Sequence, residues 1–288
     1  MKTGAQRTRS STHFMSWQMF AGLAFVALLE GCDRADFQPV RFSPVSEELF
    51  DEGGALTDAW ADIDLDGDPD RFVGFNGTPS RLYRNDGIDG FVEIAAEVGL
   101  MTKRSVRTSA WGDFDSDGDP DLLLGYSGEE PVIALWKNNG ATFTEVSEMV
   151  GLRIVSGTTR QAAWVDVDAD GDLDLFLAMR DGPNHLFIQT AGKFKNEAHN
   201  LGLNDTRRTV GALWFDDGDG WLDVVVSNMN GDTNGLYLGS EDGFTESEEE
   251  EIHAGGRAIG DETQGSVRPC SVDYDADGDF DLFFANYG

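Results

Sequence analysis

Basic residues, histidine and cysteine are scarce in this chain of 288 residues. It has 21 lysines and arginines against 53 aspartates and glutamates, four histidines and two cysteines, and its formal net charge is −32. The shortage of positive charge excludes a nucleic-acid partner, because phosphate is bound mainly through Lys and Arg. A surface of this charge attracts cations instead. With 40% apolar residues the chain can also bury a substantial core, which excludes a disordered acidic tail.

The sequence also lacks two common catalytic motifs. It contains neither H-E-x-x-H, which binds zinc in metalloproteases, nor G-x-S-x-G, which carries a nucleophilic serine. The four histidines are scattered along the chain, at His13, His185, His199 and His253. Carboxylates are abundant, but the sequence alone does not single out the pair that a glycosidase would need.

Residues 1–31 have the pattern of a lipoprotein-type signal peptide. A positively charged stretch precedes an apolar run of 16 residues, 14–29, which is short for a membrane span. The following "LEGC" resembles a bacterial lipobox, although Glu30 departs from the small or apolar residue that is usual there. We predict export, cleavage before Cys32, lipid attachment to this cysteine and a short linker over 32–39. Ordinary cleavage or a retained anchor are the alternatives.

An aspartate-rich segment recurs five times in the rest of the chain. "WADIDLDGDPDRFVG" starts at Trp60, and its counterparts start at Trp111, Trp164, Trp214 and Ser271. Their first aspartates are 51, 53, 50 and 57 residues apart, and a period of about fifty residues indicates a propeller or a solenoid. The repeat region covers 40–288, with loops at 62–70, 113–121, 166–174, 216–223 and 273–281.

Short β-rich runs follow each loop. In the first repeat these are "DRFVGF", "RLYRN" and "GFVEIAAEVGL", at 70–75, 81–85 and 90–100, and the other repeats keep this order as far as they extend. Strands of five or six residues without a long helical period predict an all-β protein. Three or four strands per repeat match the blade of a β-propeller. Pieces such as "AAEVGL" predict single helical turns between blades.

Two further positions are expected to lie in the core. A tryptophan stands two residues before the first aspartate of four loops, which predicts packing between blades for Trp60, Trp111, Trp164 and Trp214. Cys270 occupies the register of Ala59, Ala110, Ala163 and Leu213, which predicts a small buried side chain. If Cys32 carries lipid, no disulfide can form within the chain.

The loop spacing D-x-D-x-D-G-D-x-D predicts an oxygen cage for a metal ion. Side chains 1, 3 and 5 of a tight turn point to one side, glycine at 6 permits the reversal, and a carbonyl at 7 and a carboxylate at 9 complete the cage. Ca²⁺ accepts such irregular cages, Mg²⁺ prefers a strict octahedron, and the loops lack the His and Cys that zinc favours. An EF-hand is excluded because its position 12, a glutamate, is apolar here: Val73, Leu124, Leu177 and Phe284.

The predicted calcium ligands are the loop aspartates. At positions 1, 3, 5 and 9 of the four complete loops they are Asp62, Asp64, Asp66 and Asp70; Asp113, Asp115, Asp117 and Asp121; Asp166, Asp168, Asp170 and Asp174; and Asp273, Asp275, Asp277 and Asp281. Position 7 is expected to bind through its carbonyl with the side chain toward water, at Asp68, Asp119, Asp172 and Asp279. The shortened loop predicts a weaker or rearranged site formed by Asp216, Asp217, Asp219 and Asp223.

These loops and strands resemble the FG-GAP/VCBS-type repeat proteins. The segments "DGDFDLFFANYG", "RLYRNDG" and "GFVEIAAEVGL" are more similar still to the cartilage-acidic-protein-like group, which often carries an ASPIC/UnbV domain. The resemblance covers roughly 40–288 and implies an exported, calcium-loaded β-propeller, usually without catalysis by the propeller itself. The ASPIC/UnbV segment that often follows the propeller is absent from this sequence.

Two functions remain open at this point. The leading one is a calcium-stabilised binding or scaffold module of the bacterial cell envelope or periplasm, attached to the membrane only through the lipid anchor. Its ligand would be a protein or a carbohydrate that the sequence does not identify. The alternative is an exported propeller enzyme, or an enzyme-associated domain, that acts on polysaccharide.

The last repeat ends early. The sequence stops at "FFANYG", directly after the first β-rich run, and residues 40–50 resemble the closing part of a repeat whose beginning is missing. The two ends could share one blade, but its middle strand would still be lacking. We therefore expect a truncated part of a longer propeller that associates through bare strand edges, which light scattering would detect.

Overall fold

The computed structural model describes residues 49–128, 130–154, 156–248, 265–266, 268–272, 281–284 and 286–287. The predicted signal peptide, the linker and Cys32 lie outside the described residues, and so do Asp273, Asp275, Asp277 and Asp279 of the fifth loop. Among the helices of the described residues, none is both long and apolar enough to cross a membrane.

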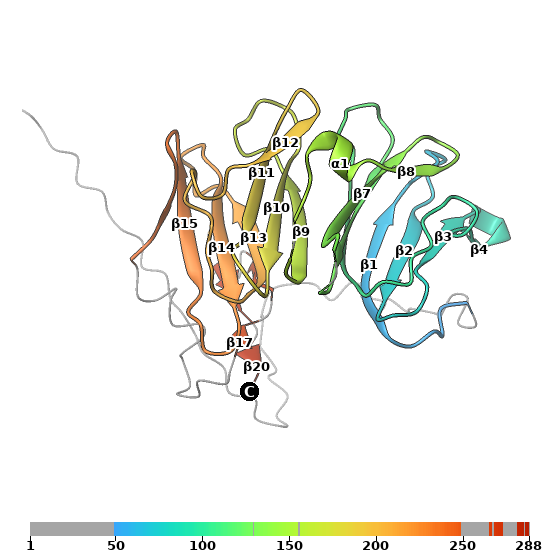
Figure 1. Ribbon diagram of the computed structural model, residues 1–288, viewed down its shortest axis with the longest axis horizontal. Helices are drawn as coiled ribbons and strands as arrows, with labels where there is room; N and C mark the ends of the chain where they lie inside the picture. The colour runs from blue at the N-terminus through green and yellow to red at the C-terminus, as the bar shows by residue number, and fades with distance from the viewer. Residues whose placement is uncertain are drawn as a thin grey trace, which may run out of the picture. The chain divides into compact units, whose positions relative to one another are not determined.

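The described chain folds into four-stranded antiparallel sheets, one for each of the first four repeats (Figure 1). Sheet 1 has β1 (Ala55–Ala61), β2 (Asp70–Phe75), β3 (Arg81–Asn85) and β4 (Phe91–Glu93). Sheet 2 has β5 (Val106–Gly112), β6 (Asp121–Tyr126), β7 (Ile133–Asn138) and β8 (Phe143–Glu145). Sheet 3 has β9 (Thr159–Val165), β10 (Asp174–Met179), β11 (His185–Thr190) and β12 (Lys193–Asn196). Sheet 4 has β13 (Thr209–Phe215), β14 (Asp223–Asn228), β15 (Gly235–Ser240) and β16 (Gly243–Glu246).

Shorter elements complete the described chain. The two helical ones are a 3₁₀ turn, η1 (Gly87–Asp89), and one helical turn, α1 (Ser147–Val150), between sheets 2 and 3. Two short pairs follow sheet 4: β17 (Gly265–Ser266) with β20 (Asn286–Tyr287), and β18 (Cys270–Val272) with β19 (Asp281–Phe283). Each full sheet keeps its strands in chain order, as a propeller blade does. The prediction of an all-β array of blades is confirmed.

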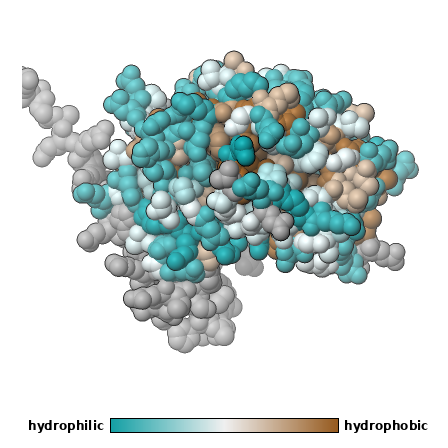
Figure 2. Space-filling view, in the orientation of Figure 1, coloured by the Kyte–Doolittle hydropathy of each residue, from teal (hydrophilic) through white to brown (hydrophobic). Residues whose placement is uncertain are grey.

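Consecutive sheets pack face to face, which explains the apolar second strand of each repeat. Strand β1 contacts β5, β5 contacts β9, and β9 contacts β13. Side chains alternate along β6, so Leu122 and Leu124 join the core shared with sheet 1, whereas Leu123 joins the core shared with sheet 3. The strand is therefore buried on both faces and carries no polar alternation. The face shown in Figure 2 presents both hydrophilic and hydrophobic side chains on its coloured surface.

The tryptophan prediction is confirmed for three of the four residues. Trp111, Trp164 and Trp214 pack against the cores between successive sheets. Trp164 requires a glycine on the neighbouring sheet, because a Cβ on Gly112 would lie 2.6 Å from Cδ1 of the indole. Trp60 is instead 50% exposed and contacts Phe91 and the Arg71 guanidinium. The prediction of packing between blades is wrong for Trp60. On this outer side of sheet 1, the buried side chains pack against Leu49 and Phe50 and not against another described sheet.

The burial predicted for Cys270 is also wrong, although its register is right. Cys270 pairs with Phe283 as Ala59 pairs with Phe72, so the strand alignment holds. The side chain is nevertheless exposed. Within the described residues, β18 and β19 form only a two-stranded sheet, which offers less cover than the four-stranded sheets give to the equivalent positions.

Candidate metal centres

Each aspartate loop connects the first two strands of its sheet. The chain must turn back within nine residues, and each loop that the structure describes does so with two left-handed residues. Glycine at position 6 has φ of +96°, +95° and +93° at Gly67, Gly118 and Gly171. This confirms the role predicted for the glycine, because residues with a side chain rarely adopt such values.

Position 4 is a second left-handed residue that the sequence did not indicate. Leu65, Ser116 and Ala169 have φ of +58°, +57° and +57°. Leucine, serine and alanine do not favour this conformation. Position 4 therefore carries local backbone strain that the geometry of the loop imposes.

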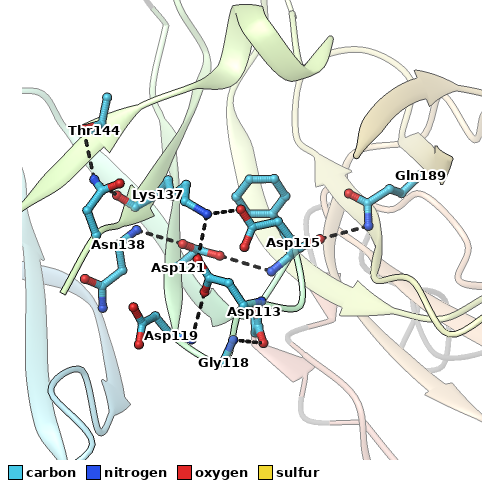
Figure 3. Close-up of polar contacts among 12 residues, drawn as sticks. Asp113, Asp115, Gly118, Asp119, Asp121, Lys137, Asn138, Thr144 and Gln189 are labelled. Carbon is cyan, nitrogen blue, oxygen red and sulfur yellow. Dashed lines mark hydrogen bonds and ion pairs between the residues drawn. The ribbon is translucent and has the colours of Figure 1, made fainter. Parts of the chain in front are cut away.

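Aspartates at positions 1 and 5 are oriented by the loop's own backbone. The carboxylate of Asp62 accepts hydrogen bonds from the backbone N–H of Asp66 (3.0 Å) and Gly67 (2.9 Å), and Asp66 accepts one from Asp68 (2.9 Å). The second and third loops repeat these contacts, as Figure 3 shows for Asp113 and Gly118. The side chains are thus held on one side of the turn by the protein itself.

Position 9 has a structural role that the sequence analysis missed. Asp121 is buried, and its Oδ2 accepts the backbone N–H of Phe114 at 3.2 Å, while its Oδ1 accepts that of Asn138 at 2.8 Å (Figure 3). Asp70 and Asp174 make the same pair of contacts. Each of these carboxylates therefore ties its loop to the third strand of the sheet.

The loops bring three carboxylates close enough to hold one metal ion. One oxygen from each member lies within 4.8 Å of the others in four described groups: Asp62, Asp64 and Asp66; Asp113, Asp115 and Asp121; Asp166, Asp168 and Asp174; and Asp216, Asp217 and Asp219. The described aspartates at position 7, Asp68, Asp119 and Asp172, belong to none of these groups and are half-buried. The clusters fit a metal ion, because carboxylate oxygens already oriented by hydrogen bonds keep lone pairs for a cation.

Burial and mutual repulsion disfavour the ionised state of several loop carboxylates. Burial raises the pKa of Asp121 to about 7 and that of Asp174 to about 6, against the lowering effect of their backbone hydrogen bonds. The pKa of Asp168, an exposed residue, is raised as well, by partial desolvation of its carboxylate and by the neighbouring charge of Asp170. A divalent cation among these groups would offset both effects.

The fourth loop keeps a cluster despite its missing residue. Asp216 takes the place of the first aspartate, since it accepts the N–H of Gly220, and Gly218 has the left-handed φ (+99°) of position 4. Asp223 still accepts the N–H of Gly239 at 2.8 Å, but its buried Oδ2 has no hydrogen-bond partner. The site is rearranged around Asp216 and Asp217, and its position-9 anchor is incomplete.

The fold and these loops define a repeat protein built from blade-like β-sheets with acidic turns. A family model described as "FG-GAP-like repeat" matches residues 62–124, 113–177 and 217–284, and the chain belongs to this family. The resemblance inferred from the sequence is thereby confirmed.

One curated protein and one solved structure illustrate what this chain is similar to. Cartilage acidic protein 1 of Xenopus tropicalis is 28% identical over 229 residues, which are 76% of this chain but 34% of the relative. The chain thus spans about a third of that relative's length. A solved structure entitled "Crystal structure of BBS1N in complex with ARL6DN, soaked with lead" aligns with a TM-score of 0.45 and 11% identity, over 68% of this chain and 56% of that one.

Proposed function

We propose that this protein is a calcium-binding, non-catalytic module that acts by binding a partner. The observation that carries the proposal is the set of preoriented carboxylate clusters in successive loops. All the donors are hard oxygens arranged around an irregular turn, which suits Ca²⁺ better than Mg²⁺, whose octahedron is strict. The ligands would be the loop aspartates, including those of the fifth loop outside the described residues.

The absence of catalysis is supported by how the buried carboxylates are used. A catalytic acid commonly has a raised pKa, and Asp121 and Asp174 have one. Both oxygens of each are engaged by backbone N–H groups, however, so these side chains hold the loops together instead of facing a substrate.

The partner we propose is a protein or a carbohydrate, and not nucleic acid. Purified protein should bind a component of a glycan or protein array in millimolar calcium and lose this binding in EDTA. Incubation with polysaccharides should release no new reducing ends. Hydrolysis or lytic cleavage that persists in a repurified protein would contradict the non-catalytic assignment and favour the polysaccharide-acting enzyme.

We further propose that the protein is exported to the bacterial cell envelope or periplasm and held there by lipid on Cys32. The support is the signal-like pattern of the first 32 residues. Cys32→Ser should abolish labelling by a fatty-acid probe and move the protein from the membrane fraction to the soluble one, since acyl chains supply the attachment. An unlabelled wild type with a mature N-terminus elsewhere would overturn this assignment.

A further inference from the structure

One position on the third strand of each sheet distinguishes the loops from one another. In each four-stranded sheet, the residue after this position donates its backbone N–H to the aspartate at position 9, which establishes the structural equivalence. The equivalent residues in sheets 1 to 4 are Arg84, Lys137, Ile188 and Leu238. The first two loops therefore have a basic neighbour here, and the next two have an aliphatic one.

Lys137 reaches into the carboxylate cluster of the second loop. Its ammonium donates to Oδ2 of Asp117 at 2.7 Å. It also donates to Oδ2 of Asp115, a contact that Figure 3 shows. Burial lowers the pKa of Lys137, but the hydrogen bonds to these two carboxylates outweigh burial and raise it. The same contact lowers the pKa of Asp117. The charged ammonium of Lys137 therefore contacts two of the proposed calcium ligands.

Arg84 does not occupy the first loop in this way. Its Nε and Nη2 donate to the two oxygens of Asp86 at 2.6 and 3.2 Å, and Nε stays 4.0 Å from Asp64. The second repeat has Asn139 in place of Asp86, and its neutral amide donates to Thr142 and Thr144 instead. The second repeat therefore lacks the carboxylate that binds Arg84 in the first repeat. Among the described contacts of Lys137, both anionic partners belong to the loop.

We propose that Lys137 is a tethered counter-ion that competes with calcium for Asp115 and Asp117, so that the second loop binds calcium more weakly than the third. This inference rests on the proposed calcium-binding function. Calcium can use both carboxylates only after two charge-assisted hydrogen bonds to the ammonium are broken. Ile188 imposes no such competition in the third loop. The protein then carries sites of graded affinity, and the lysine relieves repulsion in the second loop when calcium is scarce.

Calcium titration calorimetry on the full chain tests this inference. Lys137→Ile, which installs the residue of the third repeat, should tighten one of the resolved sites about tenfold, because it removes a nearby competing charge. Arg84→Ile is the matched control and should change affinity much less, since Arg84 is bound to Asp86. Adding Asp113→Ala to Lys137→Ile should abolish the gain and so assign it to the second loop.

A second variant covers the case in which Lys137→Ile folds poorly. Asn139→Asp recreates the outer carboxylate of the first repeat and should draw the lysine away, with a smaller gain in affinity. In EDTA, Lys137→Ile should melt at a lower temperature than the wild type, because the loop then lacks its counter-ion. Unchanged isotherms for both variants, with calcium still bound, would overturn this inference and leave the calcium function standing. If no variant and no wild type binds calcium, both fail.

Discussion

Removal of calcium with EDTA is expected to lower the melting temperature of this protein by roughly 15 °C or more. An ion that binds only the native state at 100 times its dissociation constant adds about 2.7 kcal/mol per site to the free energy of unfolding. Three complete loops lie within the described residues, and for a domain of this size each kcal/mol shifts the melting temperature by about 2–4 °C. Thermal unfolding followed by circular dichroism in calcium, in magnesium and in EDTA measures the shift.

Single loop variants separate calcium binding from general destabilisation. Asp66→Ala removes one member of the first cluster and should lower the melting temperature in calcium, with little further effect in EDTA. Asp68→Ala is the control, because this side chain lies outside every described cluster. Superimposable melting curves with and without EDTA would refute calcium-dependent stability.

Asp174→Ala is expected to destabilise the protein severely even without calcium. The wild-type carboxylate accepts the backbone N–H of Val167 at 3.0 Å and that of Gln189 at 2.7 Å, and the side chain is buried. Each buried N–H left without a partner costs about 1–3 kcal/mol, so for two such groups we expect a loss of about 2–6 kcal/mol in the free energy of unfolding. Urea denaturation in EDTA measures this loss without the contribution of calcium binding to the free energy of unfolding.

Asp168→Ala is the comparison for this variant. Asp168 belongs to the same cluster but is exposed, so its loss should matter mainly in calcium. Asp174→Asn should fall between the two, because the amide oxygen can accept one N–H while the amide nitrogen meets the other donor. If Asp174→Ala costs no more than Asp168→Ala in EDTA, the anchoring role of position 9 is wrong.

The repeat period, the strand order and the position of every described loop were predictable from the sequence. These features depend on local chemistry: glycine at position 6 permits the reversal, and an apolar run after each loop forms a buried strand. The packing of Trp60 and Cys270 was not predictable in the same way. Equivalence within a repeat assigns a residue to a strand and a register, but burial depends on which neighbouring sheet covers that strand.

The division of labour among the loop aspartates was decided by the tertiary structure. Their spacing is the same in the three complete described loops, and nothing in it separates Asp121, which anchors the loop, from Asp115, which lies beside Lys137. The separation arises because hairpin pairing brings the N–H of Asn138 against the ninth position and the lysine before it against the third and fifth. Contacts between residues 15 to 22 positions apart depend on how the strands pair, so local sequence specifies the carboxylates but not the partners they meet.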